Sequence, residues 1–268
     1  MHGLGNDFII FDAPAGGAPS ADVFRRLADR YTGIGFDQAL MLEPARKPGT
    51  AVFYRIFNAD GREVEQCGNG ARCIARFIRE RDGKSGGELV LDSTGGLVQT
   101  RMKGEQVSVT MGVPNFDPAS LPFEASGEAY VYPLSVGASE VEIGAVSVGN
   151  PHAVIQRVPN RAELLRLGPL VEHHARFPER TNVQLVRVDG DHDLTVGVWE
   201  RGAGETLSSG TSAVAASGAA VANGWCESPV TVHLAGGDLR VQLEDGHAVL
   251  TGPAEEICSV ELSEEFAL

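Results

Sequence analysis

The chain has 268 residues, of which 43% are hydrophobic and 22% are charged, and its formal net charge is −14. This length and apolar content suffice for one large domain or two smaller ones. The negative charge argues against nucleic acid or an anionic membrane as a partner, because both attract basic surfaces. The chain lacks an apolar run of about 18 residues, which a transmembrane helix needs, and its start lacks the pattern of a signal peptide. We therefore expect a cytoplasmic protein.

In the first half, alternating patterns predict short strands, and two segments predict helices. A peripheral helix is expected to begin at Ser20, directly after Pro19. Its expected apolar face comprises Val23, Phe24, Leu27 and Tyr31. A second helix is expected after Cys67, and it ends near Gly83, a typical helix C-terminal signal.

The second half follows the same plan. Asn160, with Glu163 three residues later, forms a capping box that predicts the start of a peripheral helix. We expect the helices that follow Cys67 and Ser209 to be small and apolar nearly all round, as the run "SAVAASGAAVA" is. A helix without a polar face is normally buried. Each half is therefore expected to wrap a sheet around one central helix.

The two halves also match each other along the sequence, which indicates an internal repeat. Asn6 and Asn150 each follow a glycine and precede a strand pattern, 144 positions apart. A second alignment matches residues 63–83 to residues 205–225, at an offset of 142 positions. A Gly-Gly pair before two alternating strands recurs in each half, 141 positions apart.

We therefore predict an α+β (α/β) fold with two pseudo-symmetric halves, residues 1–115 and 129–268. Each half is expected to hold a mixed or antiparallel sheet wrapped around its central helix, and the last strand can pack back on the first half. The alignment places Ser209 of the second half opposite Cys67 of the first. An active-site cleft is expected between the halves.

Cys67 lies between the predicted strands and the predicted central helix, and Gly-Asn-Gly follows it. The first N–H groups of a helix lack intrahelical partners and carry a partial positive charge, so they bind carboxylates well. The same field lowers the pKa of a thiol, which can then act as a base near neutral pH. The spacing of Cys67, Cys73, Cys226 and Cys258 matches neither a zinc site nor a disulfide framework. We expect free thiols and no bound metal.

Seven segments occur in an order that resembles the diaminopimelate epimerase family: "MHGLGNDF", "GFDQ", "RIFNADG", "QCGNGARC", "GNPH", "RTN" and "ERGAGET". They extend over nearly the whole chain. The resemblance implies two α/β halves, each with a central helix, and usually a homodimer. It also implies an isomerase of lysine and peptidoglycan precursor synthesis, which inverts the α-carbon of diaminopimelate with two facing cysteines. No pyridoxal phosphate or other cofactor is expected.

The resemblance also assigns roles to single residues. Cys67 matches the first catalytic cysteine, and Ser209 occupies the position of the second. His152 and Glu200 match residues that tune the pKa values of the two thiols. The residues that match the substrate-binding set are Asn6, Gln38, Asn58, Gly68, Asn69, Asn150, Asn182, Glu200, Arg201, Gly210 and Thr211.

Ser209 departs from the family pattern, which has a cysteine there, and Ser212 stands where the family usually has glycine. A hydroxyl is much harder to deprotonate than a thiol, so Ser209 is a poor base without an activating partner. The departure leaves three alternatives to full epimerisation. These are a one-base lyase that expels a β-substituent, a racemase of another amino acid, and a catalytically weak binding protein.

Local sequence allows other interpretations of some site residues. Asn58 precedes Ala-Asp-Gly and Asn182 precedes a strand, so each could be a turn residue. Arg201 could form a surface ion pair with Glu200. The resemblance favours ligand contacts for the two asparagines, and the position of Arg201 beside Gly-Ala-Gly and a helix start favours carboxylate binding.

Overall fold

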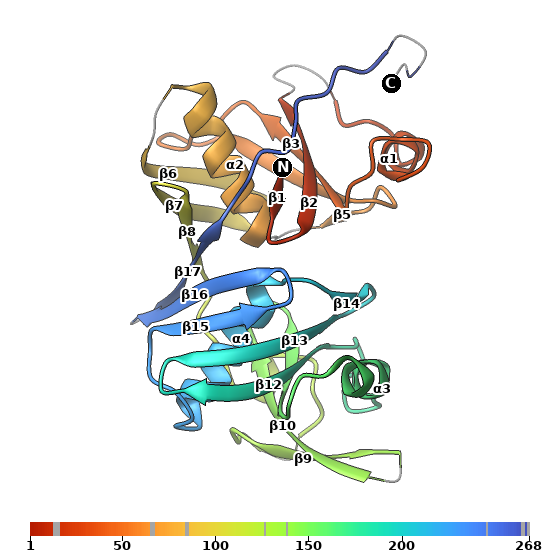
Figure 1. Cartoon of the computed structure of the whole chain (residues 1–268), viewed down its shortest axis with the longest axis vertical. Coiled ribbons are helices and arrows are strands. Elements are labelled where there is room, and N and C mark those ends of the chain that lie inside the picture. The colour runs from red at the N-terminus through yellow and green to blue at the C-terminus, as the bar shows by residue number, and fades with distance from the viewer. Residues whose placement is uncertain are drawn as a thin grey trace. The chain divides into compact units, whose positions relative to one another are not determined.

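A computed structural model describes residues 1–12, 17–64, 68–83, 86–125, 127–137, 139–244, 246–263 and 266. The chain divides into two compact units, residues 1–109 with 252–268, and residues 110–251. It passes between them twice, within β8 (Gln106–Met111) and within β17 (His247–Pro253). Within the described ranges, no helix is long and apolar enough to cross a membrane. Both units have the mixed α/β architecture expected from the sequence (Figure 1).

The first unit contains a mixed sheet and two helices. Its strands, besides parts of β8 and β17, are β1 (His2–Gly3), β2 (Asn6–Asp12), β3 (Gln38–Glu43), β4 (Phe53–Asn58), β5 (Glu63–Val64), β6 (Gly86–Ser93) and β7 (Gly96–Lys103). Its helices are α1 (Ala21–Ala28) and α2 (Gly68–Arg81). β2 pairs in parallel with β3, and β3 pairs antiparallel with β4. β4 pairs in parallel with β6, and β6 pairs antiparallel with β7.

The second unit contains the corresponding elements and one additional hairpin. The hairpin strands are β9 (Tyr132–Val136) and β10 (Ser139–Ser147), and a 3₁₀ turn at Pro118–Ser120 precedes them. The other strands are β11 (Pro151–Gln156), β12 (Asn182–Gly190), β13 (Asp193–Glu200), β14 (Gly204–Thr206), β15 (Val230–Leu234) and β16 (Gly237–Glu244). The helices are α3 (Arg161–Glu172) and α4 (Gly210–Ala222).

The strand pairing of the second unit repeats that of the first in the same register. In the parallel pair β2–β3, Phe8 lies opposite Gln38, and in the parallel pair β11–β12, His152 lies opposite Asn182. Both of the latter positions come 144 residues later. In the next, antiparallel pairs, residue 39 lies opposite 57 and residue 183 lies opposite 199. The internal repeat seen in the sequence therefore corresponds to a repeated three-dimensional arrangement of strands.

The first peripheral helix begins where the sequence predicts but ends earlier. The Ser20 hydroxyl caps α1 by accepting the N–H of Val23, and Phe24 is fully buried. Tyr31 is 98% exposed, so its assignment to the apolar face is wrong. The helix ends at Ala28, and the carboxylate of the next residue accepts the N–H of Tyr31 at 2.8 Å, which holds the chain in a turn.

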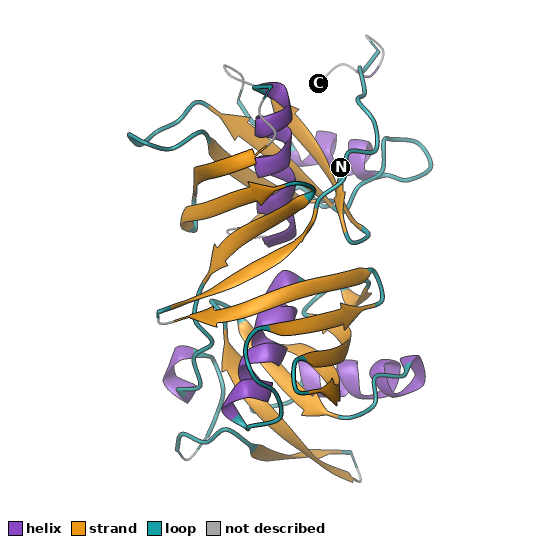
Figure 2. Ribbon diagram, turned by 60° about the vertical axis from the view of Figure 1, so that its left-hand side comes forward, coloured by secondary structure: helices purple, strands orange, loops and turns teal. Residues whose placement is uncertain are grey.

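The central helix α4 is buried on all sides, as its composition predicts. It contacts β10 to β13, β15 and β16. In Figure 2 the strands of this unit lie around it, whereas α3 lies at the edge. Its small side chains allow this close approach of strands from several directions. The start of α4 is therefore held rigidly by the surrounding sheet.

The central helix α2 does not have the apolar surface that we expected. It carries four arginines, of which Arg72 is fully buried. Arg72 Nε donates to the Pro253 carbonyl at 3.1 Å, and Arg76 donates to the carbonyl of Ala254. The carbonyl that accepts from Arg72 Nε offsets part of the cost of burying this charged group. The arginines thereby tie the C-terminal segment, which returns to this unit, to α2.

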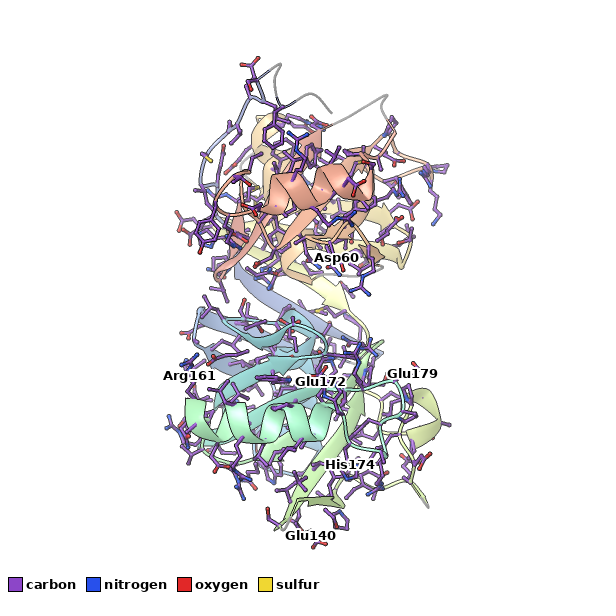
Figure 3. All side chains as sticks on the ribbon, turned by 90° about the vertical axis from the view of Figure 1, so that its right-hand side faces the viewer. Asp60, Glu140, Arg161, Glu172, His174 and Glu179 are labelled. Carbon is purple, nitrogen blue, oxygen red and sulfur yellow. The ribbon has the colours of Figure 1, made fainter. Side chains whose placement is uncertain are left out.

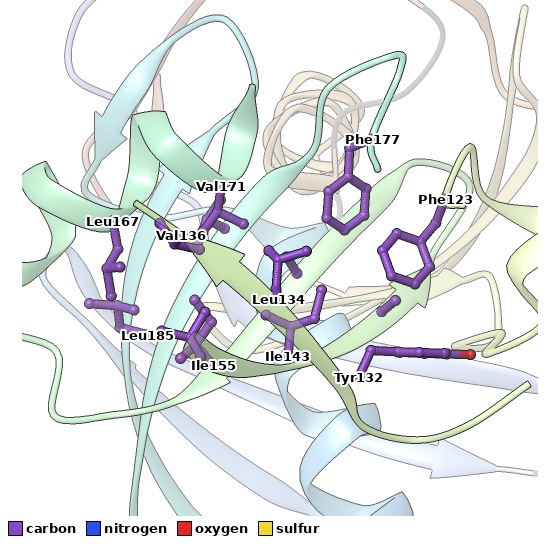
Figure 4. Packing of buried hydrophobic residues seen from close by; sticks show 14 of the residues in the cluster. Phe123, Tyr132, Leu134, Val136, Ile143, Ile155, Leu167, Val171, Phe177 and Leu185 are labelled. Carbon is purple, nitrogen blue, oxygen red and sulfur yellow. The ribbon is translucent and has the colours of Figure 1, made fainter. Parts of the chain in front are cut away.

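The core of the second unit holds α3 on its sheet. Phe123 and Phe177 lie with their ring centroids 4.6 Å apart, in the same cluster as Leu167 and Val171 of α3 (Figure 4). The rest of this cluster comes mainly from β9 to β12. Large apolar groups of this kind contribute roughly 1.5–3 kcal/mol each when fully buried. The end of α3 is therefore fixed against the strands that carry the candidate site.

Candidate active site

In the first unit, carboxamide side chains gather at one end of the sheet. Asn6 begins β2, Gln38 begins β3, and Asn58 ends β4. Because β2 and β3 are parallel and β4 is antiparallel to β3, these positions share one end. Gln38 Nε2 donates to Asn58 Oδ1 at 2.9 Å. Asn58 is thus more than a turn residue, because its side chain accepts a hydrogen bond from Gln38 on the neighbouring strand.

Asn6 is oriented by partners on both sides of its amide. Its Oδ1 accepts a hydrogen from Asn69 Nδ2 at 3.2 Å, and its Nδ2 donates to Asp37 Oδ2 at 2.9 Å. Arg30 binds Asp7 with two 2.8 Å hydrogen bonds and also reaches Asp37 at 2.9 Å. Partial burial raises the pKa of Asp7, but the hydrogen bonds from Arg30 and from the backbone of Asp37 outweigh it, and the net pKa is lowered. Asp37 and Arg30 are positioning residues that the sequence did not reveal.

Gly68 is the first residue of α2, and buried Asn69 is the second. Cys67 directly precedes Gly68 in the chain and lies outside the described residues. The sequence neighbour of Cys67 is therefore a helix N-terminus, where backbone N–H groups favour an anion. This agrees with the expected position of Gly68 and Asn69 at a carboxylate-binding helix start.

In the second unit, Ser209 is the N-cap of α4. Its hydroxyl oxygen accepts the backbone N–H of Ser212 at 3.5 Å, and it lies 3.5 Å from the hydroxyl of Thr211. Ser209 is 5% exposed, and Gly210 begins the helix. Serine is among the preferred N-cap residues. The hydroxyl thus has a structural role at the same helix start that the repeat matches to Cys67.

His152 is fully buried beside the half-buried Asn150. His152 Nε2 lies 2.8 Å from Asn150 Oδ1, and His152 Nδ1 lies 3.1 Å from Gln184 Nε2. Burial is the main cause that lowers the pKa of His152 to about 3; the hydrogen bond with Gln184 opposes this, and the positive charge of Arg201 adds to it. His152 therefore stays neutral at physiological pH and acts as a hydrogen-bonding group.

Gln184 is a buried site residue that the sequence analysis missed. Its Nε2 also donates to Ser212 Oγ at 3.0 Å, so it joins His152 on β11 to the first turn of α4. The signal in the sequence was the glutamine in the otherwise apolar stretch "VQLV" of β12. A buried polar group needs partners, but the sequence does not identify them.

Asn182 connects three segments of the second unit. Its Nδ2 donates to the Pro151 carbonyl at 2.9 Å, and its Oδ1 accepts the backbone N–H of Arg201 at 2.9 Å. The Arg201 guanidinium donates to the Glu179 carbonyl at 3.1 Å. Asn182 therefore fixes the backbone of Arg201. The exposed guanidinium of Arg201 is held on one side by the carbonyl of Glu179.

A buried carboxylate supports the turn after β13. Glu172 lies at the end of α3 (Figure 3) and accepts the N–H of Gly202 at 2.8 Å and the indole N–H of Trp199 at 2.7 Å. Trp199 reaches it because Gly168 has no side chain, and a Cβ there would meet the indole at 2.5 Å. Glu172 thus anchors the turn that carries Arg201. No local pattern in the sequence singles out Glu172.

Each unit brings together one part of the expected set. In the first unit, Asn6 contacts Asn69 and Gln38 contacts Asn58. In the second, Asn150 contacts His152, and Asn182 contacts Arg201. Glu200 ends β13 next to that turn. Within the part of the chain that the structure describes, no group of three or more His, Cys, Asp or Glu is placed to hold a metal ion. The groups present suit recognition of carboxylates and amines and transfer of protons.

Comparison with known proteins tests the family. The family model for diaminopimelate epimerase matches residues 1–116 and 144–257. The diaminopimelate epimerase of Pseudomonas entomophila (strain L48) is 46% identical over 262 residues, covering 96% of this chain and 95% of the relative. That of Stutzerimonas stutzeri (strain A1501) is 45% identical over 263 residues, with coverage of 96% and 95%.

The fold also recurs in more distant proteins. The crystal structure of a probable proline racemase from Agrobacterium radiobacter K84, with bound carbonate, has a TM-score of 0.69 at 15% identity. The similarity covers 98% of this chain and 92% of the other, and it concerns the fold alone. The near-complete relatives and the family model confirm what the ordered motifs indicated: this chain belongs to the diaminopimelate epimerase family.

Proposed function

We propose that this protein is an isomerase that interconverts LL- and meso-diaminopimelate without a cofactor. The observation that carries the proposal is the equivalence of two helix starts in the two repeats. Cys67 precedes Gly68 at the start of α2, and Ser209 precedes Gly210 at the start of α4. Helix N-termini favour the carboxylate of an amino acid, and each has a side chain with a transferable proton beside it.

In the proposed reaction, the Cα–H bond of the substrate breaks and its proton passes to one of the two groups. The electron pair moves into the carboxylate, where helix N–H groups stabilise the added negative charge. The other group then returns a proton to the opposite face of the carbon. Cys67 acts as a thiolate base, and Ser209 acts on the second face. Neutral His152 serves by hydrogen bonding, since burial keeps its pKa at about 3.

The carboxamides and Arg201 account for recognition of the rest of the substrate. Asn58, Asn150 and Asn182 offer amide groups, and Arg201 offers a planar guanidinium that suits a distal carboxylate. We propose that these four residues select a substrate that carries a second amino acid group at its distal end. We further propose a homodimer that acts on this small molecule, as the family resemblance implies. We propose that it lies in the cytoplasm and binds neither nucleic acid nor membrane, in line with its net charge of −14.

One observation favours a second candidate, proton exchange from a single face. Ser209 is the N-cap of α4, and its hydroxyl oxygen faces the N–H of Ser212. A hydroxyl in that position is a weak acid and a weaker base than a thiolate. If it transfers protons too slowly, Cys67 would exchange the α-proton without inversion.

Proton NMR of the full-length protein with LL- or meso-diaminopimelate in D₂O tests both candidates. The epimerase predicts loss of the α-proton signal together with appearance of the other stereoisomer. Single-face exchange predicts loss of the signal from one stereoisomer with retained configuration. Cys67→Ala is the control and should remove exchange in both cases. Absence of exchange with either stereoisomer, while another amino acid is racemised, would overturn the proposed substrate.

A further inference from the structure

A buried chain of hydrogen bonds runs through the second unit from Asn150 to Ser209. Asn150 contacts His152 at 2.8 Å, and His152 contacts Gln184 at 3.1 Å. Gln184 contacts Ser212 at 3.0 Å, and the Ser212 backbone N–H reaches Ser209. His152, Gln184 and Ser212 are each 0% exposed. The chain thus joins a half-buried amide to the helix start that carries Ser209.

The direction of these hydrogen bonds follows from Gln184. An amide nitrogen can only donate, so His152 Nδ1, which faces Gln184 Nε2, must accept. A neutral imidazole then carries its proton on Nε2, and this N–H donates to Asn150 Oδ1. The oxygen of Asn150 is therefore occupied. Within the described ranges, Asn150 Nδ2 donates to no protein group, so this residue has amide hydrogens left for a ligand.

The opposite orientation of the Gln184 carboxamide would be less stable. Gln184 Nε2 uses both of its hydrogens, one on His152 and one on Ser212. Gln184 Oε1 is buried and has no hydrogen-bond partner in the described part of the chain. Rotating the amide by half a turn would bury its two hydrogens where the unpartnered Oε1 now lies, and His152 Nδ1 and the Ser212 hydroxyl would have to donate instead of accept. Unpaired buried donors are destabilising, so the packing holds Gln184 in the observed direction.

We propose that Gln184 is a positioning residue that, through the tautomer of His152, makes Asn150 present its amide hydrogens to a carboxylate group of the substrate. Ser212 contributes by holding the second hydrogen of Gln184 at the first turn of α4. The inference rests on the proposed function for the identity of the carboxylate. It does not require that Ser209 transfer a proton.

The first test is the tautomer itself, measured without substrate. The ¹⁵N chemical shifts of the His152 ring in the full-length protein distinguish the two neutral tautomers. The wild type should show the proton on Nε2. Gln184→Met removes both donors with little change of volume, and it should give a mixture of tautomers. A wild-type ring protonated on Nδ1 would overturn the inference, and this measurement does not depend on how well the variant folds.

The second test is the kinetic effect of the same variant. Asn150 would contact the substrate carboxylate before and during the reaction, so a misdirected amide should raise KM and leave kcat nearly unchanged. We expect KM for diaminopimelate to rise about threefold to tenfold, as for loss of one hydrogen bond. Gln242→Met is the matched control, because the Gln242 side chain is exposed on β16 and donates to the exposed Glu244. Equal KM values for both variants would contradict the proposal.

The third test concerns the polarity of Asn150. Asn150→Asp keeps the shape but removes the amide hydrogens and adds a negative charge. If Asn150 donates to a carboxylate, this variant should bind diaminopimelate more weakly than Asn150→Ala does. If Asn150→Asp binds as well as wild type, the residue presents its oxygen and the inference is wrong. A protein that neither binds nor exchanges diaminopimelate would refute the proposed function, whereas the ring shifts would still decide the role of Gln184.

Discussion

The backbone N–H of Ser212 points to the hydroxyl oxygen of Ser209 at 3.5 Å, and this contact makes Ser209 the N-cap of α4. The position therefore combines two tasks. It closes the first turn of a buried helix, and it stands where the repeat aligns Cys67 of the other unit. Serine suits capping well but proton transfer poorly, because its hydroxyl is much less acidic than a thiol.

We expect substitutions of Ser209 to separate these tasks. Ser209→Cys should raise the rate of epimerisation, since a thiol titrates nearer to neutral pH. Ser209→Ala should abolish inversion and leave exchange from one stereoisomer. It should also lower the free energy of unfolding by about 1 kcal/mol through loss of the cap. Deuterium incorporation from each stereoisomer and urea unfolding measure these effects.

Ser20→Ala is the matched control for the Ser209 variants. Ser20 caps α1 through the N–H of Val23 at 3.4 Å, so its loss should reduce stability by a similar amount without changing proton exchange. Epimerisation by Ser209→Ala at the wild-type rate would show that Ser209 transfers no proton.

Cys67 should react with an alkylating agent faster than the other three cysteines at neutral pH. A helix N-terminus stabilises the thiolate, which is the reactive form. Cys73 is 0% exposed, and burial raises the pKa of the Cys226 thiol, so both should label slowly. Exposed Cys258 is the control, because diaminopimelate should protect Cys67 and leave Cys258 reactive. Mass spectrometry that finds Cys67 the slowest to label would reject its role.

Replacing Arg201 by lysine should weaken the binding of diaminopimelate by about 1.5–3 kcal/mol. Lysine cannot present the planar pair of donors that grips a carboxylate. It would also lose the geometry of the present contact with the Glu179 carbonyl. Arg101→Lys is the control, because Arg101 is exposed on β7 and pairs with Glu88 at 3.7 Å. Calorimetry measures the affinity for diaminopimelate. An unchanged affinity of the Arg201 variant would show that Arg201 is a surface residue that does not bind the substrate.

Glu172→Gln should disturb the turn that carries Arg201. The amide would set an N–H group against either the indole of Trp199 or the N–H of Gly202, which both donate to Glu172 now. We expect the free energy of unfolding to fall by about 1–3 kcal/mol, and KM for diaminopimelate to rise.

The same substitution at Glu179, which is exposed, provides the control for Glu172→Gln and should change neither quantity. Urea unfolding and steady-state kinetics compare the two variants. Identical KM values would show that Glu172 does not support the substrate site.

The buried His152 should make the protein less stable in mild acid. Its folded pKa of about 3 lies below the ordinary 6.5, so the unfolded chain binds the proton more readily between these values. The stabilisation is fully present above pH 6.5 and is lost as the pH falls towards 3, by roughly 4–5 kcal/mol in total. Urea unfolding across this range should show a shallower slope for His152→Gln than for wild type. His173→Gln, at an exposed position, should keep the wild-type slope.

Features that depend on near neighbours in the chain were determined by the sequence. Ser20 and Asn160 were identified as helix starts, and both side chains accept the N–H group three residues later. The apolar run after Ser209 indicated a buried helix, and α4 is buried. The order of motifs identified the family, and the repeat predicted two units with equivalent strands. Caps, periodicity and repeats are local or self-similar patterns, so one sequence suffices to recognise them.

Only the tertiary structure decided the partners of the buried polar groups. Gln184 was an isolated amide in an apolar strand, and its partners His152 and Ser212 lie 32 and 28 positions away. Glu172 is buried only because Trp199 and the following turn pack against it and donate to its carboxylate. The helix α2 is not apolar all round, because Arg72 and Arg76 donate hydrogen bonds to the carbonyls of Pro253 and Ala254. These partners lie 181 and 178 positions later in the chain. A buried hydrogen bond depends on which distant segments pack together, and no local pattern in the sequence records that choice.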